Sequence, residues 1–111
     1  MQTNPEYFEV GDFVAYPTDG SAHITWQHSG ALKTITFDTA HFDSGFGTGV
    51  EKVILHIGNP PSHGAIWFVM TAIDGTSIPC RLDTAGNVYM CNYTGRDLTG
   101  YNFYGQVVYV E

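Results

Sequence analysis

The side chains best suited to chemistry are the histidines, the acidic residues beside them and the two cysteines. No two histidines have the HxH or HxxxH spacing with which a strand or a helix presents a metal site. Asp43 follows His41 by two residues in a glycine-rich segment, and an imidazole beside a carboxylate can hydrogen-bond a sugar hydroxyl or act as a general base. We therefore expect no metal and no cofactor, with His41 and Asp43 as a candidate ligand site. The histidines are His23, His28, His41, His56 and His63.

Motifs for covalent or phosphate chemistry are not recognisable. No serine lies in a nucleophile elbow. The glycine-rich run at residues 45–49, GFGTG, lacks a following GK[ST] and precedes a predicted strand rather than a helix. We expect a turn-rich connection there and a protein that is not an enzyme. A small hydrolase or isomerase that uses His41 and Asp43 is an alternative.

The two cysteines flank a predicted four-residue turn, Thr84 to Asn87. If Asp83 faces Val88 across this turn, Cys80 faces Cys91, at a Cα separation of roughly 4.5–5.5 Å that a disulfide can span. Two buried thiols in contact are the alternative. The N-terminus lacks the basic and apolar regions of a signal peptide, which favours the thiols.

Aromatic side chains give the most useful binding signal, with seven Tyr, seven Phe and two Trp. Tyr and Trp combine an apolar face with a polar group, which suits sugar stacking and protein interfaces. Trp26 shares a strand face with Ile24 and is expected in the core, whereas Trp67 is expected at the surface or between subunits. Polar loop residues would bind hydroxyls on a rigid scaffold. The candidate ligand-binding residues are His41, Asp43, Asn59, His63, Trp67, Asn92 and Tyr93.

The elements that must position these residues are strands. Residues 7–10 and 13–16 flank a Gly-Asp pair and predict a kinked strand or a tight pair. Residues 23–27 and 32–37 alternate apolar and polar side chains, with Ile24, Trp26, Ile35 and Phe37 inward, and predict a hairpin. A long irregular segment at 38–49, a strand at 51–57 and a proline-stiffened loop at 58–64 follow.

The remaining residues predict a three-stranded meander at 66–93 and a final strand at 101–110. Asp74-Gly75 predicts a two-residue type I′ turn in the meander. Its first strand is apolar on both faces, since Trp67, Val69 and Ile73 lie opposite the inward positions. We expect another subunit to cover that second face in part.

Length and composition favour one all-β domain over residues 1–111. Charged residues are only 14% of the chain, 13 residues are Gly, and no apolar stripe has helical spacing. About eight short strands with regular turn signals predict an antiparallel β-sandwich or jelly roll.

The net charge of -7 and the distribution of apolar residues argue against nucleic acid and membranes as partners. The four Lys and Arg residues are scattered singly, so we expect no nucleic-acid binding. No apolar run approaches the length of a membrane span, so we expect no membrane insertion.

The segments GNVYM (86–90) and GYNFYGQVVYVE (100–111) resemble the distal head domains of phage tail fibres and receptor-binding proteins. The resemblance implies a virion protein, trimeric, that binds host surface saccharide or a protein receptor without chemistry. The HxH motif of some fibre axes is missing, so no axial metal is implied. The alternative within this class is a structural virion component, a capsid decoration or tail protein, that binds protein rather than sugar.

Overall fold

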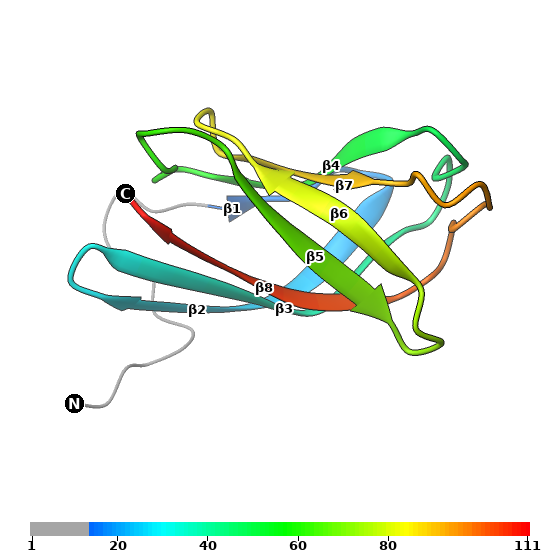
Figure 1. Cartoon of the computed structure of the whole chain (residues 1–111), viewed down its shortest axis with the longest axis horizontal. Coiled ribbons are helices and arrows are strands. Elements are labelled where there is room, and N and C mark those ends of the chain that lie inside the picture. Colours follow the sequence, from blue (N-terminus) through cyan, green and yellow to red (C-terminus); the bar gives the residue numbers. More distant parts are fainter. Residues whose placement is uncertain (1–13) are drawn as a thin grey trace.

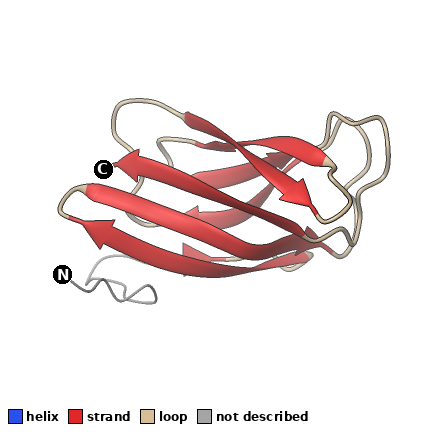
Figure 2. Cartoon of the chain, turned by 60° about the horizontal axis from the view of Figure 1, so that its bottom comes forward, coloured by secondary structure: helices blue, strands red, loops and turns tan. Residues whose placement is uncertain are grey.

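A computed structural model describes residues 14–111, and every regular element in that range is a β-strand (Figure 2). The prediction of an all-β fold of about eight strands is confirmed, although β2 and β3, with 10 and 11 residues, are longer than expected. The strands are β1 (Val14–Ala15), β2 (Gly20–Ser29), β3 (Leu32–Phe42), β4 (Glu51–Ile57), β5 (Ile66–Ala72), β6 (Ser77–Leu82), β7 (Asn87–Cys91) and β8 (Phe103–Val110).

The strands form one antiparallel sheet in the order β1-β4-β7-β6-β5-β8-β3-β2. The sheet curls until β4, near one edge, contacts β2 and β3 at the other edge. The result is a sandwich-like antiparallel fold around one apolar core. The predicted meander occupies the middle of the sheet as β5, β6 and β7, and β8 lies between β5 and β3 (Figure 1).

The inward faces of β2 and β3 agree with their alternating sequence pattern. Trp26, Ile35 and Phe37 are at most 1% exposed and belong to the core. Lys33 shares this face. Its ammonium nitrogen lies 5.7 Å from the centre of the Trp26 ring and 3.5 Å from the Glu111 carboxylate, so its charge is paired where the core meets the end of β8.

The first turn of the meander contains three residues. The Ala72 amide donates to the Thr76 carbonyl at 2.7 Å, and the Gly75 amide donates to the Ala72 carbonyl at 2.9 Å. Gly75 has a φ of 90°, but Asp74 is not among the residues with positive φ. The predicted type I′ turn is therefore wrong, because that turn needs positive φ at both central residues.

The second turn likewise contains three residues, 84–86, one fewer than predicted, whereas the first turn is one residue longer than predicted. The Asp83 amide donates to the Asn87 carbonyl at 3.0 Å, and the Asp83 carboxylate accepts from the amides of Ala85 and Asn87. Gly86 has a φ of 92°, and a Cβ there would lie 2.2 Å from the Ile57 carbonyl oxygen. Only glycine fits between this turn and the end of β4.

Strand β3 continues through Phe42, so the irregular segment predicted from residue 38 begins at Asp43 instead. His41 is consequently a strand residue and not a loop residue. The strand predicted at residues 7–10 lies outside the described residues. The strand predicted at 13–16 is present as the two-residue β1, which pairs with β4. None of the described residues form a helix with the length and apolar character needed to cross a membrane.

Strands β5 and β8 pair over only three residue pairs, 70–72 with 103–105. Gly105 stands at the end of this ladder, and a Cβ there would lie 2.8 Å from the Val69 carbonyl oxygen. Glycine therefore permits the two strands to pack closely at this point. Beyond it β5 continues to Ile66 and β8 continues to Val110 without pairing to each other.

Candidate functional site

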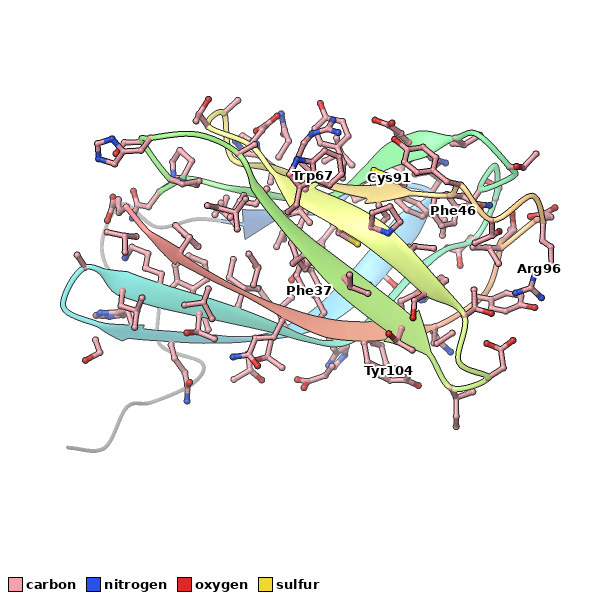
Figure 3. All side chains as sticks on the ribbon, in the orientation of Figure 1. Phe37, Phe46, Trp67, Cys91, Arg96 and Tyr104 are labelled. Atoms are coloured by element: carbon pink, nitrogen blue, oxygen red, sulfur yellow. The ribbon has the colours of Figure 1, made fainter. Side chains whose placement is uncertain are left out.

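Three planar side chains stand in a row across β5, β6 and β7 on the outward face of the sheet. Trp67 faces Arg81 in the β5–β6 register, and Arg81 faces Tyr89 in the β6–β7 register. The Arg81 guanidinium carbon lies 5.2 Å from the centre of the Trp67 ring and 4.3 Å from the centre of the Tyr89 ring. The cation thus contacts both rings, while Trp67 remains 56% exposed at the upper side of the molecule in Figure 3.

A carboxylate and a phenol complete this group. One Glu51 oxygen accepts from the Arg81 guanidinium at 3.4 and 3.5 Å, and the other accepts from the Tyr93 hydroxyl. The hydrogen bond from Tyr93, aided by the charge of Arg81, holds the pKa of Glu51 below its usual value. The same hydrogen bond raises the pKa of Tyr93 to about 12. We call Glu51, Trp67, Arg81, Tyr89 and Tyr93 the aromatic platform.

The two cysteines lie on opposite faces of the sheet beneath and beside this platform. Cys80 faces Met90, and Cys91 faces Glu51 of β4, so the predicted register with Cys80 opposite Cys91 is wrong by one residue. Cys80 packs in the core, whereas the Cys91 thiol contacts the Tyr93 hydroxyl on the outward side. Both cysteines are free and buried, and burial raises the pKa of each thiol.

Asn92, a predicted ligand-binding residue, joins two loops instead. It is fully buried, and its amide nitrogen donates to the carbonyls of Phe46 and Arg96 at 3.0 and 2.7 Å. Its amide oxygen accepts from the main-chain amide and the hydroxyl of Thr94 at 3.1 and 2.7 Å. Every hydrogen-bonding group of this side chain is therefore used within the protein.

His41 and Asp43, the predicted pair, do lie in contact at the end of β3. The His41 Nε2 atom lies 3.0 Å from the Asp43 carboxylate and 3.5 Å from the Ser21 hydroxyl. In a catalytic triad the carboxylate and the nucleophile contact different ring nitrogens, whereas here they share one. Nδ1 is buried and has no hydrogen-bond partner among the described residues. The geometry does not prepare Ser21 for nucleophilic attack.

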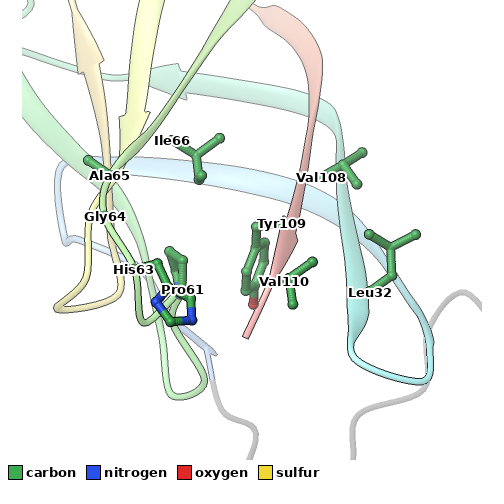
Figure 4. Close-up of a pocket in the computed structure, with 9 residues that line it drawn as sticks. All are labelled: Leu32, Pro61, His63, Gly64, Ala65, Ile66, Val108, Tyr109 and Val110. Atoms are coloured by element: carbon green, nitrogen blue, oxygen red, sulfur yellow. The ribbon is translucent and has the colours of Figure 1, made fainter.

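An open cleft of about 410 Å³ lies where β5 and β8 part, and we call it the β5–β8 cleft. Figure 4 shows the β4–β5 loop with His63 on one side and the ends of β3 and β8 on the other. Exposed aliphatic side chains dominate it, among them Val108 and Val110. Asn59 contributes its main chain nearby, because its carbonyl accepts from the Tyr109 hydroxyl at 2.7 Å.

The structure does not gather the predicted ligand-binding residues in one place. Only Trp67 and Tyr93 of that set belong to the aromatic platform. The sequence reasoning missed Glu51, Arg81 and Tyr89. Arg81 and Tyr89 occupy outward positions of β6 and β7, and Glu51 begins β4, which pairs with β7. If both turns had been predicted with three residues, Arg81 would have faced Trp67 on one side and Tyr89 on the other. That alignment is the signal that could have identified Arg81 and Tyr89.

Across residues 14–111, no three His, Cys, Asp or Glu side chains come together in a group that could hold a metal ion. No family model matches the chain, and neither does any curated protein or any solved structure.

Proposed function

We propose that this chain is a non-enzymatic recognition domain of the phage tail-fibre or receptor-binding type, and that it binds host cell-surface carbohydrate at the aromatic platform. The observation that carries the proposal is the exposed Trp67 ring held beside Arg81. The proposed site lies on a sheet face, whereas the sequence pointed to loops. In this role the domain would stand at the virion surface.

The platform offers the two kinds of contact that a sugar needs. A pyranose ring has an apolar C–H face and a rim of hydroxyl groups. Trp67 supplies an exposed aromatic surface for the ring face. Arg81 supplies N–H donors and Glu51 supplies acceptor oxygens for the hydroxyl groups. Because Arg81 packs against Tyr89 on its other side, these groups are held in place before a ligand arrives.

The test is to compare Trp67→Ala with Tyr104→Ala on a glycan array and on host cells. Tyr104 is a matched control, since it is 41% exposed and faces Thr71, away from the platform and lower in the view of Figure 3. We expect Trp67→Ala to weaken binding at least about tenfold, as for a buried aromatic anchor of an interface, and Tyr104→Ala to bind like wild type. Unchanged binding by Trp67→Ala would remove the platform from the proposal, and an array without any bound glycan would refute it.

A structural virion component that binds protein is the second candidate, and the β5–β8 cleft favours it. Leu32, Val108 and Val110 are 46%, 45% and 52% exposed at this cleft, and exposed aliphatic side chains in a concave surface are typical of protein contacts. The subunit contact expected from the sequence is instead the second face of β5 and the residue after it, where Trp67, Val69 and Ile73 are exposed. Because the platform proposal assigns Trp67 to the ligand, we propose that a homo-oligomer, with a trimer favoured by the resemblance, forms at the cleft. Binding of the isolated domain to purified coat particles, without binding to any glycan, would favour this candidate.

A further inference from the structure

Every cationic side chain of the chain already has a partner. The chain has only four Lys and Arg residues, and all of them lie within the described range. Three form ion pairs with carboxylates, and the fourth hydrogen-bonds a hydroxyl. The pairs are Lys33 with Glu111, Lys52 with Asp19, Arg81 with Glu51, and Arg96 with Thr76.

Arg81 is the one cation of the aromatic platform, and Glu51 balances its charge. Because the hydrogen bond from Tyr93 and the charge of Arg81 keep the pKa of Glu51 low, Glu51 stays ionised at neutral pH. An anionic group placed on Arg81 would lie next to this carboxylate and would meet like-charge repulsion. The net charge of -7 adds a repulsive field at longer range.

The row of side chains is longer than a single sugar ring requires. Trp67, Arg81 and Tyr89 stand on three adjacent strands in direct register. Strands are about 4.8 Å apart, so the row spans roughly 10 Å. It presents stacking and hydrogen-bonding groups along a line, which suits consecutive units of an oligosaccharide.

From these contacts we infer that the ligand of the aromatic platform is an uncharged glycan, an oligomer of neutral hexoses or N-acetylhexosamines. The inference rests on the proposed function and names the class of sugar that the same site accepts. Arg81, the cation of the platform that an acidic glycan would need, is already paired with Glu51. Hydroxyl groups can share the donors of Arg81 and the acceptors of Glu51 without displacing this ion pair.

The test uses a panel of neutral hexose and N-acetylhexosamine oligosaccharides, each paired with its sialylated or uronic-acid form. We expect the wild-type protein to bind the neutral member of a pair at least about tenfold more tightly. Glu51→Gln leaves Arg81 without its carboxylate, so it should shift the preference toward the acidic member by about fivefold, the scale of a partly exposed ion pair. Asp38→Asn, which makes the same charge change on β3, should shift the preference much less, since it changes only the long-range field.

The outcomes separate this inference from the proposed function. Tighter binding of the acidic members by wild type would overturn the inference and leave carbohydrate recognition intact. A preference that Glu51→Gln and Asp38→Asn change equally would also overturn it, because net charge would then be the cause. Binding to no member of the panel would overturn both.

Discussion

The aromatic platform and the β5–β8 cleft lie on either side of β5, but opposite features of the sheet create them. The platform draws four of its five side chains from the adjacent strands β4, β7, β6 and β5, and Tyr93 follows the end of β7. Regular pairing of β5, β6 and β7 places Arg81 between Trp67 and Tyr89. The cleft exists because the ladder between β5 and β8 stops after three pairs. Continuous pairing positions polar and aromatic groups at fixed spacings, whereas interrupted pairing leaves a concave surface of aliphatic side chains. The first suits hydroxyl recognition and the second suits burial against protein.

The largest expected effect comes from Gly86, in the turn that joins the platform strands β6 and β7. In Gly86→Ala the new Cβ would meet the Ile57 carbonyl oxygen at 2.2 Å, in a backbone conformation that disfavours side chains. We expect a loss of about 3 kcal/mol in the free energy of unfolding. Gly95→Ala is the matched control, because Gly95 has a φ of 84° and no atom would lie within 4 Å of its Cβ. Urea denaturation should show a loss of about 1 kcal/mol in the free energy of unfolding for Gly95→Ala. Equal losses in the two variants would contradict the close contact between Gly86 and Ile57.

A charged side chain introduced into the β5–β8 cleft should affect self-association and leave the platform intact. If copies of the chain associate there, Val108→Arg should weaken association by about 2 kcal/mol or more, which native mass spectrometry would show as a shift toward monomer. Binding at the platform should not change, since Val108 lines the cleft and not the platform. Gln27→Arg, at an exposed position of β2, controls for added charge. An oligomer that withstands Val108→Arg would place the subunit contact elsewhere.

The reactivity of the Cys91 thiol measures how well Tyr93 of the platform shields it from solvent. Cys91 is buried and contacts the Tyr93 hydroxyl, whereas Cys80 is buried in the core. Neither thiol of the folded protein should react quickly with a thiol reagent, because burial raises the pKa of both thiols. Tyr93→Ala should speed the labelling of Cys91 about tenfold or more and leave Cys80 protected, as read by mass spectrometry of the labelled peptides. Equal acceleration at both sites would mean that the variant loosens the whole fold.

The smallest expected effect is the alkaline titration of Tyr93. Its pKa is raised from 10.0 to about 12, chiefly by the hydrogen bond to Glu51. A raised pKa in the folded state favours the protonated phenol, so this contribution to stability is fully present below pH 10 and is lost as the pH rises through about 12. The difference in urea midpoint between wild type and Tyr93→Phe should therefore shrink across that window. A difference that stays constant would contradict the assignment.

Strand faces could be predicted from the sequence because they depend only on alternation along one strand. That rule placed Trp26 inside and Trp67 outside, and both placements are correct. It also implies an inward Lys33, but the partner that makes this tolerable, Glu111, is distant in sequence. The register between strands was harder to predict, because Asp-Gly is compatible with hairpin turns of two or three residues. A change of one residue in the length of a turn changes every facing pair of the hairpin.

The candidate site was only partly predictable for the same reason. Trp67 and Tyr93 were found as exposed aromatic residues, but the ion pair between Arg81 and Glu51 depends on the register of three strands. Asn92 was misleading, because a polar residue near a turn has the same local pattern whether it binds a ligand or a loop. Its contact with Phe46 joins residues 46 positions apart, and no local pattern encodes such a contact.

The central place of β8 has a consequence for the speed of folding. This strand is the last of the eight along the chain, yet it pairs with β3 on one side and with β5 on the other. The two groups of strands that it joins cannot form one sheet until residues 103–110 arrive. Pairing of β8 with β3 joins residues as distant as Leu32 and Val110, so a long loop must close, which makes the rate-limiting step slow. During synthesis the edges of β3 and β5 stay open until β8 has left the ribosome, and open strand edges expose the chain to aggregation in this interval.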